Sequence, residues 1–270
     1  MRQPDFPVPV SITAVSDGDH DHRALWRSGV GPPAYYDVMA ATQFAMLHAL
    51  GLRESDVVAD VGCGSLRVGR LLVPYLAAGH YYGIEPRELR LRAGIDEHLG
   101  DHLVKVKRPT FSVSDDFGLD RFGVKFDVVL AQSIFSHTYQ DLTAVGFTKI
   151  ARALQPEGLF VGTFVERVPL LPPGVTARTP TSGSGWFSEG SVPYRWREIR
   201  ALLADAGLAG RPLRWWHHRQ TWFVAGLPSG QDAMRRRVRG MRHHLYGAPR
   251  ALRVAPGITA RLGLRRALRP

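Results

Sequence analysis

The 270-residue sequence contains very little cysteine and has no long apolar run. Cys63 is the only cysteine, so no disulfide can form within the chain, and a reducing, cytoplasmic location is expected. No run of about 18 apolar residues is present, which argues against a membrane span. The N-terminal residues do not show a basic segment followed by an apolar one, which argues against a secretory signal.

Acidic residues are almost absent from the C-terminal part of the chain. Residues 228–270 contain 11 Arg, no Lys and one acidic residue, Asp232, which gives a net charge of +10. Residues 1–227 contain the other 24 basic residues against 23 acidic ones, a net charge of +1. The excess positive charge therefore belongs to the tail, and the near-neutral remainder disfavours a nucleic-acid substrate.

Short apolar runs alternate with helical patterns between residues 35 and 227. This alternation predicts an α/β fold with a mostly parallel sheet flanked by helices. We expect residues 1–34 to form an irregular arm or lid, 35–227 the domain, and 228–270 a partly helical, Arg-rich extension. The expected strands are 57–61, 81–84, 111–113, 126–131, 159–164 and one within 213–227; the expected helices are 35–50, 66–77, 87–99, 140–154 and 196–206.

The most informative stretch is 57–69, with the sequence Val-Val-Ala-Asp-Val-Gly-Cys-Gly-Ser-Leu-Arg-Val-Gly. A short strand ends in a carboxylate, Asp60, and leads through a glycine turn into a helix. The turn differs from the dinucleotide fingerprint G-x-G-x-x-G because Arg67 stands where the third glycine would be. Asp60 would repel a pyrophosphate but attract a cation such as an ammonium near a sulfonium.

This stretch resembles motif I of the class I S-adenosylmethionine-dependent methyltransferases. The resemblance implies a Rossmann-like fold with a seven-stranded sheet, an antiparallel terminal strand, and S-adenosylmethionine as cofactor with S-adenosylhomocysteine as product. It places Asp60, Gly62, Cys63 and Gly64 against the methionine part of the cofactor. The family has a third glycine where this chain has Leu66, so a differently shaped turn is expected here.

The resemblance also assigns cofactor roles to residues at the ends of three further strands. Glu85, next to Pro86, ends the second strand, where the family carries an acid that accepts the ribose hydroxyls. After the third strand, Asp115 is the preferred acceptor for the adenine amino group and Asp116 the alternative. The remaining expected cofactor contacts are Phe117 beside the adenine ring, and Gln132 and Ser133 after the fourth strand.

The segment after the fourth strand narrows the choice of methyl acceptor. Gln132-Ser133-Ile134-Phe135 differs from the Asn/Asp-Pro-Pro-Tyr/Phe segment that methyltransferases of nucleobase amino groups use. Carbon-5 methylation of pyrimidines needs a cysteine nucleophile, and Cys63 is committed to the glycine turn. Both observations disfavour a nucleobase acceptor. A hydroxyl acceptor needs a base, for which His137 is the catalytic candidate. The alternative for His137 is a packing or capping role, and the weaker candidates are Tyr139, Glu166, His217 and His218.

The motifs together look like those of bacterial methyltransferases associated with glycan or secondary-metabolite assembly. This resemblance implies O-methylation of a hydroxyl on a sugar, glycolipid or secondary metabolite, so the expected partner is a small-molecule or glycan acceptor. Two alternatives stay open: a catalytically inactive cofactor-binding or scaffold protein of the same fold, and an RNA methyltransferase that uses the basic tail.

Two further segments have residue types that suit binding. Asp17-Gly18-Asp19-His20-Asp21-His22 carries metal-compatible side chains, but a solvated loop fits better, and no metal site is predicted. In the tail, Met234, Val238, Met241 and Leu245 recur at helical spacing among arginines. Either residues 231–269 bind an anionic membrane peripherally, or the apolar stripe packs on the domain.

Overall fold

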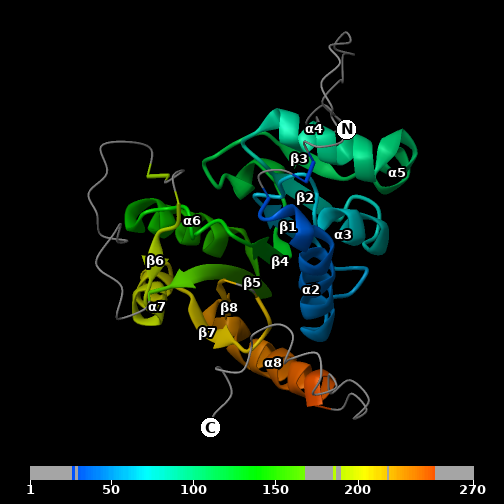
Figure 1. The fold of residues 1–270 in the computed structure, drawn as a ribbon. Helices are drawn as coiled ribbons and strands as arrows, with labels where there is room; N and C mark the ends of the chain where they lie inside the picture. The colour runs from blue at the N-terminus through cyan, green and yellow to red at the C-terminus, as the bar shows by residue number, and fades with distance from the viewer. Residues whose placement is uncertain (1–25, 28–29, 168–184, 187–189, 218, 247–270) are drawn as a thin grey trace, which may run out of the picture.

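The chain folds around one mostly parallel sheet with helices on both faces (Figure 1). The computed structural model describes residues 26–27, 30–167, 185–186, 190–217 and 219–246. The strands are β1 (Val58–Val61), β2 (Tyr81–Ile84), β3 (Thr110–Ser112), β4 (Phe126–Ala131), β5 (Leu154–Glu166), β6 (Pro193–Tyr194), β7 (Ala209–Leu213) and β8 (Thr221–Gly226). The α-helices are α2 (Tyr36–Ala49), α3 (Gly69–Tyr75), α4 (Glu88–His98), α5 (Gly100–Lys107), α6 (Gln140–Ala153), α7 (Trp196–Asp205) and α8 (Gln231–Tyr246). Short 3-10 turns are η1 (Pro33–Tyr35), η2 (Leu119–Phe122) and η3 (Pro228–Gly230).

The strand order confirms the expected fold class. Along the main path the order is β3-β2-β1-β4-β5-β8-β7, and β6 pairs with β5 beside it. Strands β1 to β5 pair in parallel, whereas β8 is antiparallel to both β5 and β7. The order reverses between β1 and β4, and in parallel α/β sheets such a reversal opens a crevice at the carboxyl ends of the strands.

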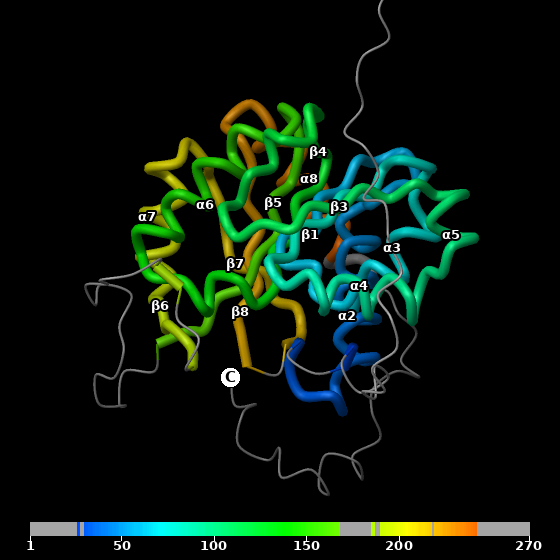
Figure 2. Tube along the Cα trace, turned by 90° about the horizontal axis from the view of Figure 1, so that it is seen from above, coloured from blue at the N-terminus to red at the C-terminus, as the bar shows by residue number. Residues whose placement is uncertain are grey.

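Alternating side chains along the strands build two cores, one on each face of the sheet. Val58 and Val128 face a cluster that includes residues of α2, α3 and α8. Their neighbours Ala59 and Val129 face the other cluster, which includes residues of α6 and α7. Figure 2 shows α6 and α7 on one side of the strands and α2 and α3 on the other. Because each strand is covered on both faces, its sequence reads as a continuous apolar run.

Most predicted elements are confirmed, with differences at several boundaries. Strands β2 and β4 have the predicted bounds. Helix α5 was not predicted, because the expected helix 87–99 stops before Gly100; Gly100 does take a positive φ of 60°, but a new helix starts there. Strand β5 begins at Leu154 and passes through Pro156, so it starts before the expected strand 159–164. A register shift between Phe126 and Val128 of the neighbouring strand accommodates this irregular start.

The described end of the predicted N-terminal arm lies against the glycine turn. The Trp26 ring packs edge-on against Tyr36, with ring centroids 4.9 Å apart. The Tyr36 hydroxyl bonds to His98 Nε2 at 2.9 Å and donates to the carbonyl of Ser65 at 3.1 Å, while the Ser65 hydroxyl donates to the carbonyl of Trp26. These bonds attach residues around Trp26 to the turn after β1, although residues 1–25, including the Asp17–His22 run, lie outside the described residues.

Helix α8 is the described part of the tail, and its packing distinguishes between membrane binding and packing on the domain. Met234, Val238 and Met241 are each at most 4% exposed and belong to the same core cluster as residues of α2 and α3. The apolar stripe therefore packs on the domain, and the alternative in which it faces a membrane is wrong for these residues. No helix in the described part of the chain is long and apolar enough to span a bilayer.

Candidate active site

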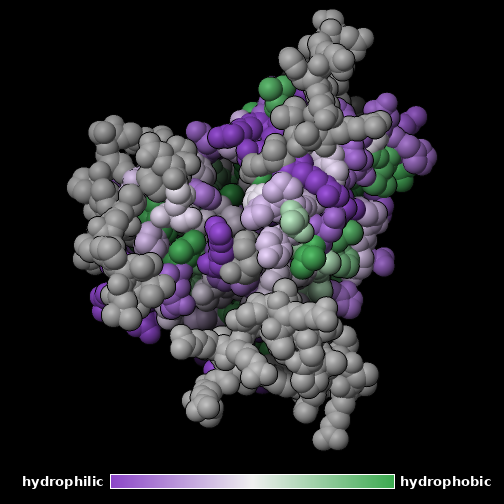
Figure 3. Space-filling view, viewed as in Figure 1, coloured by the Kyte–Doolittle hydropathy of each residue, from purple (hydrophilic) through white to green (hydrophobic). Residues whose placement is uncertain are grey.

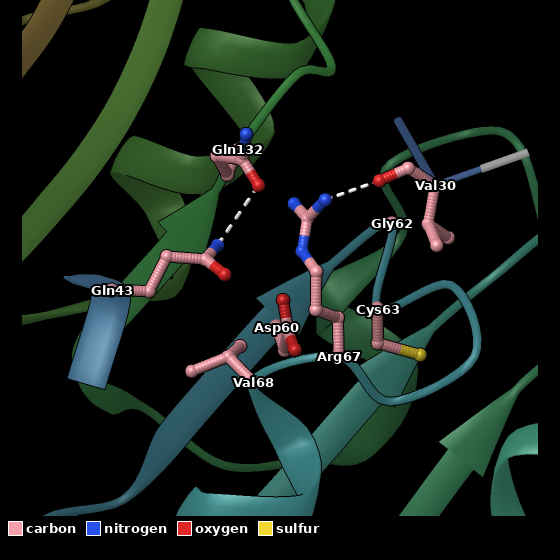
Figure 4. Close-up of a pocket in the computed structure, with 8 residues that line it drawn as sticks. All are labelled: Val30, Gln43, Asp60, Gly62, Cys63, Arg67, Val68 and Gln132. Carbon is pink, nitrogen blue, oxygen red and sulfur yellow. Dashed lines mark hydrogen bonds between the residues drawn. The ribbon is translucent and has the colours of Figure 1, made fainter. Parts of the chain in front are cut away.

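The candidate site lies at the carboxyl ends of β1, β2 and β4, where the strand order reverses. A small cavity of about 30 Å³ opens there (Figure 4). Its lining comes from β1 and the turn after it, from α2, from the end of β4 and from the N-terminal segment: Val30, Gln43, Asp60, Gly62, Cys63, Arg67, Val68 and Gln132. Asp60, Gly62, Cys63 and Gln132 were predicted site residues, and the structure brings them together.

The turn after β1 keeps a left-handed backbone at three positions. Gly62 has φ 70° and Gly64 has φ 60°, and a Cβ on Gly62 would lie 2.1 Å from Ile134 Cδ1. Leu66 also has a positive φ, 60°, with a fully buried side chain. The turn is therefore strained at Leu66, because a leucine takes a backbone conformation that glycine favours.

Asp60 is a buried carboxylate at the floor of the cavity. It is 4% exposed and accepts a 2.8 Å hydrogen bond from the Tyr81 hydroxyl. Burial raises the pKa of Asp60 from its ordinary 3.8 to about 6; the charge of Glu85 adds to this shift, while the Tyr81 bond and Arg67 oppose it. Near neutral pH the carboxylate is ionised at an energetic cost, which a cationic ligand would offset.

Cys63 is buried in the turn and is the chain's only thiol. Burial raises the pKa of Cys63 well above its usual range, and the nearby charges of Asp60 and Glu85 raise it further. The thiol therefore stays protonated at neutral pH, which agrees with the exclusion of a cysteine nucleophile. Its sulfur packs over the backbone of β2, where a Cβ on Gly83 would lie 2.9 Å from Sγ.

Glu85 lies beside the turn, outside the lining of the cavity. It is 3% exposed; Oε2 accepts from the backbone N–H of Gly64 at 3.1 Å. Oε1 accepts from the N–H of Arg87 at 3.1 Å and from Arg90 Nη1 at 3.4 Å. Pro86, the next residue, is exposed. A carboxylate has about four acceptor positions, so a ribose contact by Glu85 is chemically open but competes with Arg90.

The residues that follow β3 differ in their exposure and in their hydrogen bonds. Asp116 pairs with Arg121 Nη2 at 2.7 and 2.8 Å, accepts from the N–H of Gly118 at 2.9 Å, and its pKa is held below the usual range first by the Ser114 hydroxyl. Asp116 is thus committed to its own loop, while Asp115 is exposed. Phe117 is 2% exposed and stacked between other rings in the core, so it shows no open face to an adenine as it is placed.

A chain of neutral hydrogen-bonding groups borders the cavity after β4. Gln132 Oε1 accepts from Gln43 Nε2 at 3.0 Å, and the Gln132 amide also reaches Ser133 Oγ at 2.8 Å. The same amide lies 2.9 Å from His217 Nε2, and Gln220 Nε2 donates to Ser133 Oγ at 2.9 Å. Gln43 and Gln220 were not predicted, because nothing in their local sequence marks a helix glutamine or a loop glutamine as part of a site.

The candidate base His137 lies in the loop after β4. It is partly buried, and its backbone N–H donates to the carbonyl of Ile134 at 2.9 Å. Among the weaker candidates, Glu166 accepts from the Thr221 hydroxyl at 3.2 Å and His218 lies outside the described residues. Within the described ranges, no group of three or more His, Cys, Asp or Glu residues is placed to hold a metal ion.

Comparisons with known proteins agree with this geometry. Residues 59–160 match the model of a family described as a methyltransferase domain. The magnesium protoporphyrin IX methyltransferase of Synechocystis PCC 6803, solved with bound S-adenosylmethionine, is 17% identical, with a TM-score of 0.55 over 77% of this chain and 91% of that one. DesVI of Streptomyces venezuelae is 19% identical, with a TM-score of 0.53 over 78% and 100% of the two chains.

The CcbJ methyltransferase of Streptomyces caelestis is 18% identical to this chain, with a TM-score of 0.53 over 73% of this chain and 91% of that one. These likenesses establish the fold, and the matched family establishes the domain. The matched segment begins within β1 and ends within β5, so it contains the glycine turn, Glu85 and the end of β4. The chain is therefore an enzyme with a methyltransferase domain, built on the fold of the class I S-adenosylmethionine-dependent methyltransferases.

Proposed function

We propose that this methyltransferase moves the methyl group of S-adenosylmethionine to a hydroxyl of a small molecule, namely a sugar, a glycolipid or a secondary metabolite. The magnesium protoporphyrin IX methyltransferase among its structural neighbours is named for a small-molecule acceptor, which supports that coarser class. The hydroxyl itself is supported by the polar groups after β4.

The residues of the turn fit the donor. Gly62 and Gly64 lack side chains where the backbone must approach a ligand, and Asp60 is a buried anion without an ion pair to a described basic side chain. When bound, S-adenosylmethionine supplies an electrophilic methyl group on a sulfonium. Asp60 would then face the ammonium of its amino-acid end, and Glu85 would accept from the ribose after Arg90 gives up its position. Asp115 would face the adenine.

The observation that carries a hydroxyl acceptor is a pair of glutamine amides whose terminal oxygens are buried and unpaired among the described residues. Gln43 and Gln220 each have a buried terminal oxygen for which the described residues supply no donor. They flank Gln132 and Ser133 through hydrogen bonds of 3.0 and 2.9 Å. A hydroxyl is both a donor and an acceptor, so it satisfies an amide group in either orientation. A buried polar group left unpaired costs about 1–3 kcal/mol, which a bound hydroxyl would recover.

The residues near β4 have separable roles in this reaction. His217 Nδ1 accepts the backbone N–H groups of Arg219 at 3.1 Å and Gln220 at 3.0 Å, so its ring proton resides on Nε2. Gln132 Nε2, which lies 2.9 Å from His217 Nε2, is also a donor, so the two nitrogens do not form a hydrogen bond in this tautomer and His217 only packs against the Gln132 amide. His137 remains the proposed general base, which would take the hydroxyl proton as the methyl group is transferred.

The test of this function is the identity of the methylated atom. Purified protein is incubated with S-adenosylmethionine carrying an isotopically labelled methyl group and with a panel of sugars, glycolipids and hydroxylated metabolites. Carbon NMR of the product then distinguishes a methyl on oxygen from one on nitrogen or carbon. We expect a methyl ether; a product methylated on nitrogen or carbon would overturn the proposal.

The proposed base is tested once a substrate is in hand. We expect His137→Gln to lower kcat by roughly 100-fold or more, since general-base catalysis contributes about 10²–10⁴-fold. Binding of S-adenosylhomocysteine should be unchanged, because the base contacts the acceptor. A His217→Gln variant is the matched comparison, and we expect it to raise KM more than it lowers kcat. Unchanged kcat in His137→Gln would assign that residue a packing role.

A further inference from the structure

Arg67 is the one residue of the cavity lining whose side chain carries a positive charge. It lies just after the glycine turn, and its guanidinium reaches into the cavity between Gln132 and Val30, above Asp60 (Figure 4). Nη1 donates to the backbone carbonyl of Val30. Nε is buried and has no hydrogen-bond partner among the described residues. The guanidinium is therefore held through Nη1, while Nε is left without a hydrogen-bond partner among the described residues.

Other partly buried arginines near the turn behave differently. Arg70 Nη2 lies 2.6 Å from Asp37, and Arg90 Nη1 lies 3.4 Å from Glu85. Arg67 has no carboxylate oxygen within 4.0 Å in the described part of the chain, although Asp60 is near enough to favour its charged form. The cavity thus keeps a cation and an anion apart, and Asp60 takes its hydrogen bond from Tyr81 instead.

Separated buried charges are costly, because neither recovers all of its lost hydration from the other. Burial lowers the pKa of Arg67, which is the sign of that cost, although a guanidinium stays protonated at neutral pH. A ligand with one ammonium and one carboxylate would satisfy both groups at once. An α-amino acid is such a ligand, and its two charged groups are attached to a single carbon atom.

We propose that Arg67 binds the α-carboxylate at the amino-acid end of the methyl donor, so that the enzyme selects ligands that retain an intact amino-acid group. This inference rests on the proposed donor. The planar guanidinium matches a carboxylate through two parallel N–H donors, and such charge-assisted hydrogen bonds are roughly twice as strong as neutral ones. The Val30 carbonyl holds Nη1 in place and leaves Nε and the second terminal nitrogen, on the Gln132 side in Figure 4, for the ligand.

The size of the cavity agrees with this assignment. About 30 Å³ is space for a few atoms, such as a charged terminal group, and it is bounded by Val30 on one side. Val30 also lies over the turn, where a Cβ on Gly64 would come within 2.7 Å of Val30 Cγ1. The same short segment therefore orients Arg67 and limits the room above the glycines.

The experiment compares two ligands by isothermal titration calorimetry on the full chain. S-adenosylhomocysteine has the amino-acid group, whereas methylthioadenosine keeps the nucleoside and the sulfur but lacks it. We expect Arg67→Met to weaken S-adenosylhomocysteine by roughly 10- to 100-fold, the range of a charge-assisted pair, and methylthioadenosine by less than about threefold. Arg67→Lys keeps the charge but loses the fork, and an intermediate loss is expected.

Controls keep a structural effect separate from a direct one. Arg70→Met removes a neighbouring guanidinium that pairs with Asp37, and both affinities should stay within about threefold of the unaltered protein. An equal loss of both ligands in Arg67→Met, or no loss of either, would overturn this inference while the donor assignment stands. Failure of the unaltered protein to bind S-adenosylhomocysteine would overturn the donor assignment and the inference with it. Far-ultraviolet circular dichroism confirms that each variant is folded.

Discussion

Asp60 illustrates, at the scale of one residue, how a binding group weakens the fold that carries it. Its pKa in the folded chain is about 6, above the ordinary value of 3.8, so between these pH values the folded state binds more protons than the unfolded state. The contribution of Asp60 to stability therefore falls as the pH rises from about 4 to about 6, and the penalty is fully present at neutral pH. A shift of about two units corresponds to roughly 3 kcal/mol.

We therefore expect Asp60→Asn to stabilise the ligand-free protein by about 1–3 kcal/mol at pH 7, because asparagine removes the buried charge and still accepts from Tyr81. The same change should weaken S-adenosylhomocysteine, since the ammonium loses its counter-charge. Urea unfolding at several pH values and calorimetry measure the two effects. Asp116→Asn is the comparison, because Asp116 has a lowered pKa and should lose stability when neutralised. A less stable Asp60→Asn protein at pH 7 would contradict the argument.

Leu66 is a second residue at which two local requirements conflict. Its positive φ of 60° favours glycine, with strain of about 1–3 kcal/mol for other residues, while its side chain is fully buried in the core. Removing a buried leucine side chain costs about 2–5 kcal/mol. We expect Leu66→Gly to destabilise the protein by about 1–2 kcal/mol net, measured by urea unfolding, and Leu66→Ala to cost more, since alanine keeps the strain. A stabilised glycine variant would show that strain dominates.

Residue types in a motif could be predicted from the sequence better than the direction in which their side chains point. Asp60, Gly62 and Gln132, which were predicted cofactor contacts, come together around the cavity, because strand ends in a parallel sheet fix their position. Phe117 was expected beside an adenine and is stacked in the core instead. Arg67 was interpreted only as an obstacle to dinucleotide binding, since nothing in its spacing shows that its side chain turns back into the cavity.

At the scale of elements, the packing of the amphipathic helix α8 against the core can be tested by substitution. Met234 is 3% exposed and lies in the cluster shared with α2 and α3. We expect Met234→Ala to lower the free energy of unfolding by about 2–4 kcal/mol, because it opens a cavity in that cluster. Arg239→Ala on the exposed face is the matched control, for which a change within about 0.5 kcal/mol is expected. Equal stability of both variants would remove α8 from the core.

Strands buried on both faces could be predicted from sequence because a short apolar run has few other structural interpretations. Strands β2 and β4 are examples, and both lie inside the parallel part of the sheet. Helix α5 and the start of β5 were missed because Gly100 and Pro156 are local stop signals that tertiary packing overrides. The periodicity of α8 shows an apolar face but cannot identify what covers it, since a membrane and a protein core present the same apolar environment.

At the scale of the whole molecule, the packing of α8 changes how the basic tail should be tested. A truncation after residue 227 would remove Met234, Val238 and Met241 from the core, so the shortened chain would expose apolar surface. Such a protein would associate with vesicles for reasons unrelated to the arginines. Substitutions on the exposed face avoid this difficulty. Arg235, Arg236 and Arg239 are exposed and contribute no side chain to that cluster.

We propose that any attraction of the molecule to a membrane is electrostatic. Among the coloured residues in Figure 3, the hydrophobic ones form small separate patches between polar residues. The full chain carries a net charge of +11, most of it in 228–270. Each arginine near an anionic surface contributes about 1 kcal/mol, and salt screens this attraction. We therefore expect the full chain to sediment with anionic vesicles at low salt and to be released as salt is raised.

The triple variant Arg235→Gln, Arg236→Gln and Arg239→Gln gives the decisive comparison, because it keeps the buried stripe of α8 and removes three exposed charges. Each lost charge should cost about 1 kcal/mol of vesicle binding at low salt, so the variant should bind roughly 100-fold more weakly. Neutral vesicles should bind neither protein. Sedimentation with neutral vesicles, or binding that persists at high salt, would indicate apolar insertion and contradict the electrostatic account; equal binding of the variant would exclude these arginines from the contact.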